Sequence, residues 1–205
     1  MDRKSHWERV YETKPATEVS WFQAQADVSR ELIEAAAPDR DAAIIDVGGG
    51  ASVLVDDLLA AGYSHLTVLD ISAAALDQAR ARLGPAAADV IWLEADVLSV
   101  ELPPAAFDVW HDRAVFHFLT DVGDRRKYVE QVRRALKPGG VIVIGTFAED
   151  GPMKCSGLDV ARYSAEQLAA ELGAGFTLVT SRRHEHTTPW GAPQAFTFCV
   201  ARFPI

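Results

Sequence analysis

The sequence contains little cysteine and no long hydrophobic run. Cys155 and Cys199 lie far apart among 205 residues and form no C-x-x-C pair, which argues against a disulfide framework or a structural zinc site. No apolar run approaches the roughly 20 residues that span a bilayer, and the N-terminus leads into no apolar stretch typical of a secretory signal. We therefore expect a cytoplasmic protein with no membrane partner. His184 and His186 lack an evident third ligand, so no metal site is predicted.

Positive charge is also scarce. The chain has 20 Lys and Arg against 29 Asp and Glu, which gives a formal net charge of -9. Because proteins bind nucleic acid non-specifically by neutralising phosphates with basic side chains, this balance disfavours DNA and RNA as partners. No internal repeat or low-complexity linker interrupts the sequence, and its length is sufficient for one substantial core. We therefore predict a single domain over residues 1–205.

Strand and helix patterns alternate through most of the chain. Short apolar runs typical of buried strands occupy 43–47, 66–69, 90–93, 107–110 and 141–144. Helical patterns are found at 5–13, 23–37, 52–61, 73–83, 125–136 and 165–172. This alternation predicts an α/β fold, with a doubly wound, mostly parallel Rossmann-like sheet covered by helices on both faces. The extended segments 176–181 and 194–202 follow one another without a helix, so they must add an antiparallel last strand.

A glycine-rich turn follows the first predicted strand, in Asp46-Val47-Gly48-Gly49-Gly50. Glycines at such a turn let a ligand approach the main chain without interference from Cβ atoms. A second acid, Asp70, ends the next predicted strand and can accept hydrogen bonds from ribose hydroxyls. The dinucleotide fingerprint requires a third small residue, and here that position holds Val53. The turn therefore indicates a nucleotide cofactor other than NAD or FAD.

The order acid-x-Gly-x-Gly-x-Ser, from Asp46 to Ser52, resembles the first motif of class I S-adenosylmethionine (SAM) dependent methyltransferases. In that family the glycine turn holds the amino-acid part of SAM, and the second acid holds the ribose. Asp96 matches the acid that commonly binds the adenine amino group. The resemblance implies a seven-stranded sheet with a reversed last strand, and S-adenosylhomocysteine as product. The cofactor-binding residues that it implies are Trp21, Asp46, Val47, Gly48, Gly49, Gly50, Asp70, Ile71, Ala95, Asp96, Val97 and His111.

A narrower resemblance involves the end of the fourth predicted strand, Trp110-His111-Asp112-Arg113, and the aromatic N-terminus. Both are similar to the thiopurine methyltransferase branch, whose N-terminal segment folds over cofactor and substrate, although His111 is an insertion here. The similarity implies a lid or substrate segment over 1–40 and a SAM-binding core over 41–205. It places Arg113 near the SAM carboxylate or the substrate, and Phe22 near the reacting centre. The expected substrate contacts are Trp7, Tyr11, Phe22, Arg113, His117 and Cys155.

Methyl transfer from SAM is an in-line displacement on a positively charged sulfonium, so an enzyme mainly supplies proximity, alignment and desolvation. A general base is needed only for an acceptor that arrives protonated. The predicted catalytic residues are His111, Asp112 and Arg113, with His111, Asp112 and His117 as candidate bases. Alternatively, Asp112 orients Arg113 through an ion pair. His117 is more simply a hydrogen-bonded core histidine, and Cys155 a free structural cysteine.

We predict a SAM-dependent methyltransferase that acts on an N, O or S atom of a small molecule, because an aromatic-lined pocket suits a small, partly apolar acceptor. Two alternatives stay open at this point. One is a protein lysine methyltransferase, which an acidic, open groove would favour. The other belongs to a different class and is a non-catalytic SAM-binding or NAD-binding sensor or partner module.

Overall fold

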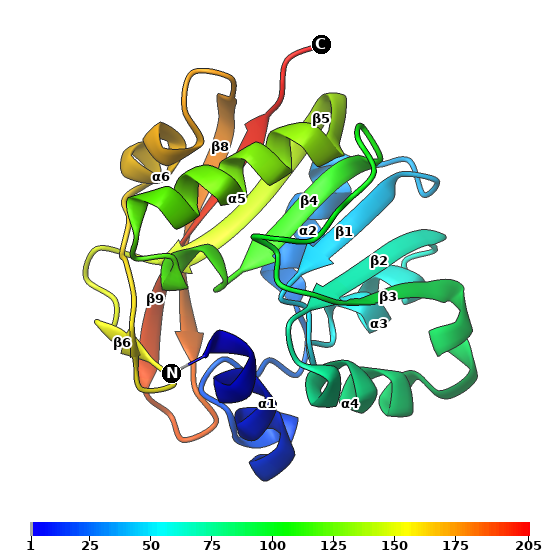
Figure 1. The fold of residues 1–205 in the computed structure, drawn as a ribbon, viewed down its shortest axis with the longest axis vertical. Coiled ribbons are helices and arrows are strands. Elements are labelled where there is room, and N and C mark those ends of the chain that lie inside the picture. The colour runs from blue at the N-terminus through cyan, green and yellow to red at the C-terminus, as the bar shows by residue number, and fades with distance from the viewer. Residues whose placement is uncertain (1) are drawn as a thin grey trace.

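The computed structural model describes residues 2–205, which form a seven-stranded sheet in the order β3-β2-β1-β4-β5-β9-β8 (Figure 1). The strands are β1 (Ala43–Val47), β2 (His65–Asp70), β3 (Val90–Glu94), β4 (Phe107–Arg113), β5 (Leu136–Phe147), β8 (Thr177–Thr187) and β9 (Pro193–Arg202). Strands β1 to β5 pair in parallel, whereas β9 runs antiparallel to both of its neighbours, β5 and β8. The predicted sheet with a reversed last strand is confirmed.

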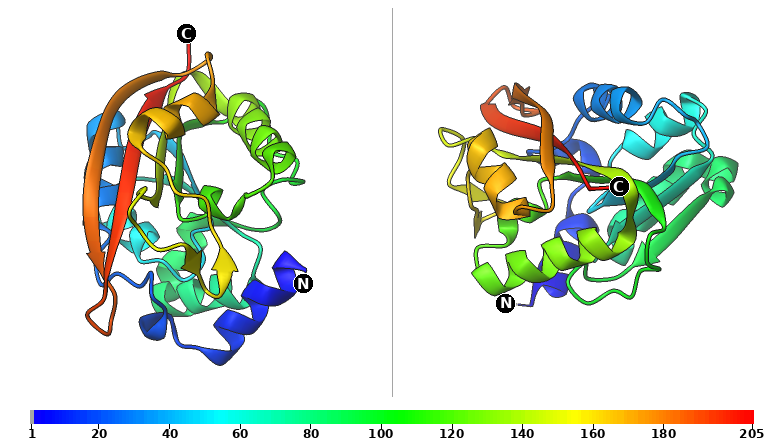
Figure 2. Two further views of the ribbon diagram at one scale, coloured as in Figure 1. Left: turned by 90° about the vertical axis from the view of Figure 1, so that its left-hand side faces the viewer. Right: turned by 90° about the horizontal axis from the view of Figure 1, so that it is seen from above.

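Helices cover both faces of the sheet (Figure 2). They are α1 (Arg3–Thr13), α2 (Asp27–Ala36), α3 (Leu54–Ala60), α4 (Ala73–Leu83), α5 (Val122–Ala135) and α6 (Ala165–Leu172), with 3-10 turns at Ala16–Glu18, Gly84–Asp89 and Phe116–Phe118. Successive strand residues point to opposite faces. Ile44 accordingly packs with the core beneath α2, α3 and α4, and Ile45 with the core beneath α5 and α6.

Element boundaries differ from the sequence prediction where tertiary contacts determine them. Helix α2 begins at Asp27 instead of residue 23, because the preceding N–H of Ala26 donates to Asp57 Oδ2 at 2.8 Å. Strand β5 is much longer than 141–144, because β4 and β9 pair with it on both sides. A small hairpin of β6 (Lys154–Cys155) and β7 (Leu158–Asp159) also forms, outside the strands and helices predicted from the sequence.

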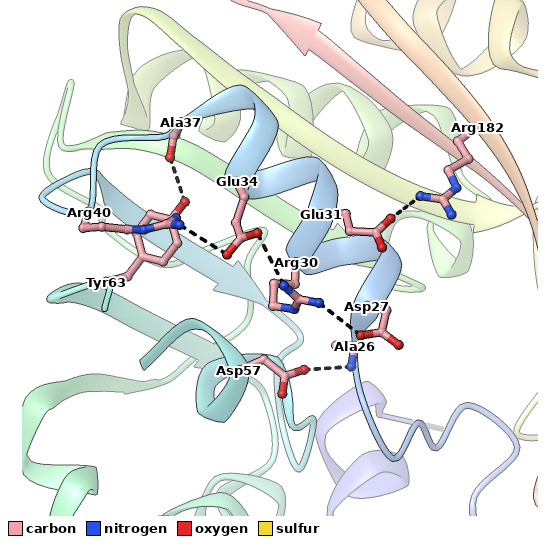
Figure 3. Close-up of polar contacts among 10 residues, drawn as sticks. All are labelled: Ala26, Asp27, Arg30, Glu31, Glu34, Ala37, Arg40, Asp57, Tyr63 and Arg182. Carbon is pink, nitrogen blue, oxygen red and sulfur yellow. Dashed lines mark hydrogen bonds and ion pairs between the residues drawn. The ribbon is translucent and has the colours of Figure 1, made fainter. Parts of the chain in front are cut away.

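The predicted lid segment divides into two structurally different parts. Helix α2 belongs to the scaffold: Ile33 is fully buried, Tyr63 donates to the Ala37 carbonyl at 2.7 Å, and Arg182 pairs with Glu31 at 2.6 Å (Figure 3). Helix α1 buries none of its residues completely and lies beyond the carboxyl ends of the parallel strands (Figure 1). It is held by exposed ion pairs, which include Lys4 to Glu94 at 2.6 Å.

Across residues 2–205, every helix is too short or too polar to span a bilayer. In the same range, no three His, Cys, Asp or Glu side chains are grouped so that they could hold a metal ion. His186 instead lies with its Nε2 atom 2.8 Å from the carbonyl oxygen of Ser20. Cys155 and Cys199 are both buried and unbridged.

Candidate functional site

Two adjoining cavities lie at the carboxyl ends of the central strands, next to α1. The larger has a volume of about 110 Å³ and reaches from the ends of β2 and β3 to Cys155 on β6. The smaller has a volume of about 50 Å³ and lies between the glycine turn and α2. Both cavities are lined by Tyr11, Trp21, Gly48 and Arg113. This is the edge at which open α/β sheets bind ligands.

Two acids line one end of the larger cavity. Asp70, at the end of β2, accepts a hydrogen bond from the Ser72 N–H at 2.8 Å through Oδ1. Its Oδ2 lies 2.7 Å from the position that a Cβ at residue 50 would take. Any residue other than glycine at this position would therefore collide with the carboxylate. Burial raises the pKa of Asp70 to about 7. Asp96, beyond β3, accepts from the Leu98 N–H at 2.9 Å.

Aromatic rings form the other end of the larger cavity. The ring of Trp7 lies edge-on to those of Trp21 and Phe118, with centroids 5.7 Å and 5.0 Å away. Trp21 Nε1 donates to the hydroxyl of Tyr11 at 3.1 Å. Burial raises the pKa of Tyr11 well above its ordinary value and that of Cys155 to about 11. The Cys155 thiol is therefore protonated and is part of the wall.

Arg113 projects from the end of β4 between the two cavities. Its Nη1 donates to the Trp21 carbonyl at 3.0 Å, and its guanidinium carbon lies 4.7 Å from the centroid of the Phe196 ring. The Nε and Nη2 atoms are buried and have no hydrogen-bond partner within residues 2–205. Burial lowers the pKa of Arg113 to about 10. Unsatisfied buried donors on a cation are costly, so this side chain fits an anionic ligand group.

The smaller cavity contains a buried chain of three side chains. His111 Nδ1 lies 2.7 Å from Asp46 Oδ1, and His111 Nε2 lies 2.9 Å from the hydroxyl oxygen of Ser29 on α2. Asp46 and His111 are register partners on β1 and β4, so their side chains point to the same face. Asp46 Oδ2 lies 2.6 Å from the position of a Cβ at residue 49, which Gly49 leaves vacant. The second carboxylate oxygen of Asp46 can therefore take its position only because residue 49 has no Cβ.

Replacing Gly48 with alanine should abolish ligand binding at both cavities. Gly48 has a φ of +68°, which costs an L-residue about 1–2 kcal/mol, and a Cβ there would collide with the side chain of Val115. Gly84→Ala is the matched control, because Gly84 also has a positive φ but nothing within 4 Å of an added Cβ. We expect calorimetry to detect no nucleotide binding to Gly48→Ala and normal binding to Gly84→Ala. Equal binding by both variants would contradict the role of the turn.

Comparison with known proteins agrees with this geometry. Residues 44–140 match the family described as a methyltransferase domain. An uncharacterized methyltransferase of Mycobacterium tuberculosis is 30% identical over 165 residues, which make up 80% of this chain and 76% of the relative. The chain belongs to the class I SAM-dependent methyltransferases. Its methyl donor is SAM, and S-adenosylhomocysteine is the product.

Other proteins similar to this methyltransferase have different named acceptors. The eEF1A lysine and N-terminal methyltransferase of mouse is 27% identical over 142 residues, which are 68% of this chain but 20% of that protein. The structure of a Burkholderia thailandensis 1,6-didemethyltoxoflavin-N1-methyltransferase, with its acceptor and S-adenosylhomocysteine bound, superposes with a TM-score of 0.74 at 20% identity. That match covers 98% of this chain and 87% of the other. The fold is therefore shared between enzymes that modify proteins and enzymes that modify small molecules.

The cavities of the methyltransferase bring together most of the residues singled out in its sequence. Those that line one or both cavities are Trp7, Tyr11, Trp21, Phe22, Asp46, Gly48, Gly49, Asp70, Ile71, Ala95, Asp96, Val97, His111, Arg113 and Cys155. Phe22 lines only the smaller cavity. Val47, Gly50, Asp112 and His117 line neither cavity. Val47 is instead part of the core beneath α5.

Asp112 lies on the opposite face of the sheet from its neighbour His111. Its carboxylate accepts hydrogen bonds from the N–H groups of Val115 and Phe116, at 2.9 and 3.0 Å, and from the Tyr128 hydroxyl at 2.5 Å. Burial raises the pKa of Asp112 to about 6. It forms no ion pair with Arg113 within the described residues. The expected roles of Asp112, as a base or as the partner that orients Arg113, do not fit this geometry.

Neither histidine is placed as a free base. Both ring nitrogens of His111 face polar partners, Asp46 and Ser29. His117 is fully buried, with its ring centroid 4.8 Å from that of Phe147, and neither nitrogen has a hydrogen-bond partner within residues 2–205. The expectation that His117 lies in the core is correct, but the hydrogen bond expected for it is absent from the described contacts. Burial lowers the pKa of His117 to about 3, so the ring is neutral.

Several residues of the site were not predicted from the sequence. Val115, Phe118 and Leu119 line the larger cavity and lie in the apolar segment just after β4. Their position after a strand end was a usable signal, because ligands gather there. Ser29 carried no such signal, since it is one small polar residue within a helix.

Proposed function

We propose that the methyltransferase methylates a small, partly apolar molecule that binds at the aromatic end of the larger cavity. The observation that carries this proposal is the enclosure of that end by Trp7, Trp21 and Phe118. The hairpin β6–β7 and α1 meet beside it, where His6 Nε2 lies 3.2 Å from the Ser156 hydroxyl. A cavity closed by rings on several sides favours a compact acceptor over an extended chain.

The remaining parts of the two cavities fit the methyl donor, which supplies an electrophilic methyl group on a sulfonium when bound. In this proposal Asp70 accepts hydrogen bonds from the ribose hydroxyls, and Asp96 accepts from the adenine amino group. Asp46 faces the amino group of the amino-acid part. The close approach of the Asp46 and Asp70 carboxylates to Gly49 and Gly50, and the nitrogens of Arg113 that have no partner within residues 2–205, support this assignment. Arg113 meets the carboxylate of the donor or an anionic group of the acceptor.

Catalysis then rests on positioning and the exclusion of water. At neutral pH the hydroxyl of Tyr11 and the thiol of Cys155 are protonated, because burial raises the pKa of both groups. Neither is a base for a protonated acceptor. In this proposal the acceptor arrives with a lone pair already free, and the rings of the cavity hold it in line with the methyl group while keeping water out.

Charge also supports a small neutral or anionic acceptor over a protein lysine. The larger cavity contains the buried guanidinium of Arg113, with its two unpartnered nitrogens. Within residues 2–205 this cation has no carboxylate partner at ion-pair distance, so a lysine ammonium entering the cavity would meet a positive charge unless the carboxylate of the donor already pairs with Arg113. The structurally similar Burkholderia enzyme has 1,6-didemethyltoxoflavin as its acceptor, and the mouse relative has a protein one, so the fold alone favours neither.

Transfer of a radiolabelled methyl group from SAM into a fractionated cell extract tests the proposal. We expect label in the low-molecular-weight fraction after removal of protein. Label retained only in protein would overturn the proposed acceptor class in favour of the lysine alternative. The Gly48→Ala variant is the control for background transfer by other enzymes. SAM binding without transfer to any fraction would instead favour the sensor.

A further inference from the structure

Ser29 has no role in the assignments above, although it lies at a functional position. Ser29, His111 and Asp46 are each at most 5% exposed. They form a continuous chain, with 2.9 Å from the Ser29 hydroxyl oxygen to Nε2 and 2.7 Å from Nδ1 to Asp46 Oδ1. All three also line the smaller cavity. The chain therefore links the scaffold helix α2 to the acid of the glycine turn.

Two hydrogen bonds hold the ring of His111 in one orientation. Nδ1 donates a hydrogen bond to one carboxylate oxygen of Asp46, because a carboxylate can only accept. Nε2 is paired with the Ser29 hydroxyl, a group that can accept from a ring nitrogen or donate to it. The second carboxylate oxygen of Asp46 takes no part in this chain.

Helix α2, which carries Ser29, is anchored by the polar contacts drawn in Figure 3. The N–H of Ala26 donates to Asp57 at 2.8 Å, three residues before Ser29. Arg182 pairs with Glu31 at 2.6 Å, two residues after it. Ile33, one turn later, is fully buried. The hydroxyl is therefore presented to His111 by a fixed backbone.

We propose that Ser29 is a positioning residue that acts through His111 to orient Asp46 toward the amino group of SAM. This inference rests on the proposed function, in which the smaller cavity receives the amino-acid part of SAM. Ser29 touches neither the methyl group nor the acceptor. It fixes the ring angle of His111, and the ring in turn fixes one carboxylate oxygen of Asp46, while the other lies against Gly49.

The test compares two ligands that differ only at the amino-acid end. S-adenosylhomocysteine carries this group, whereas 5′-methylthioadenosine has the same adenosine and thioether but lacks it. For Ser29→Ala, we expect calorimetry to give about tenfold weaker binding of S-adenosylhomocysteine, equivalent to about 1.4 kcal/mol. Binding of 5′-methylthioadenosine should stay within about twofold of wild type, which also shows that the variant is folded. Ser29→Thr, which keeps the hydroxyl, should recover most of the lost affinity.

Ile33→Val is the matched control, because it changes buried packing on the same helix without touching His111. It should affect both ligands alike. His111→Leu breaks the chain at its next link, so its effect on S-adenosylhomocysteine should not add to that of Ser29→Ala. Equal weakening of both ligands by Ser29→Ala, or no weakening of S-adenosylhomocysteine, would overturn the inference. Failure of the wild-type protein to bind either ligand would instead contradict the proposed function.

Discussion

Replacing Asp112 with alanine should destabilise the protein by about 3 kcal/mol or more, because three buried donors lose their acceptor at about 1 kcal/mol or more each. These donors are the N–H groups of Val115 and Phe116 and the hydroxyl of Tyr128. They hold the start of the segment that lines the larger cavity after β4. Urea denaturation followed by circular dichroism measures this loss of unfolding free energy.

Tyr128→Phe is the graded control for this prediction. It removes one of the three donors to Asp112, together with the acceptor for Trp110 Nε1 at 2.9 Å. We expect a loss of about 1–2 kcal/mol, clearly smaller than that of Asp112→Ala. An Asp112→Ala protein as stable as wild type but inactive would contradict the structural role and restore the catalytic one.

Replacing Asp70 with asparagine should weaken SAM binding while stabilising the ligand-free protein. An amide has the shape of the carboxylate, but it offers one acceptor fewer to the ribose hydroxyls, so we expect a loss of about 1–3 kcal/mol in binding. Asp70 is only 7% exposed, and the amide avoids the burial of a charge. Calorimetry with SAM and thermal denaturation of the free protein at pH 8 measure the two effects. A less stable Asp70→Asn protein at this pH would contradict the prediction.

The same substitution should change the pH dependence of stability. Asp70 has a raised pKa of about 7 in the folded protein against an ordinary value of 3.8, so the unfolded chain ionises first as pH rises. The contribution of this carboxyl to stability is therefore present below about pH 4 and is lost as pH rises through 7. We expect the stabilisation of Asp70→Asn to disappear near pH 4 and to be largest above pH 7. If the melting temperatures of Asp70→Asn and the wild-type protein differed by the same amount at every pH, this explanation would be wrong.

Much of the sheet could be predicted from the sequence because its strands are short and separated by helices or turns. The run at 43–47 coincides with β1, and the absence of a helix between 176–181 and 194–202 predicted the reversed strand. The length of β8 was not predictable in this way. Strand β8 extends to Thr187 through mostly exposed residues, which carry no hydrophobic pattern typical of a buried strand. Backbone pairing with β9 stabilises this part of the strand instead.

The candidate site likewise combines residues that were predictable from the sequence with residues that were not. Asp70 and Asp96 were predicted at strand ends, and both line the larger cavity. The sequence order suggests one cluster of His111, Asp112 and Arg113, yet alternation along β4 places Asp112 on the other face. The burial of both nitrogens of His117, by contrast, depends on Phe147 from another strand.

The sequence by itself determined the fold class, the glycine turn and the acids that follow each central strand. These depend on local order, because apolar periodicity and glycine spacing act within a few residues along the chain. Only the tertiary structure decided how Arg113 lies between two cavities, with two of its nitrogens unpartnered among residues 2–205, and how Ser29 reaches Asp46 through His111. Such contacts join residues dozens of positions apart, and their direction depends on which face of a packed element each side chain occupies. No local pattern contains that information.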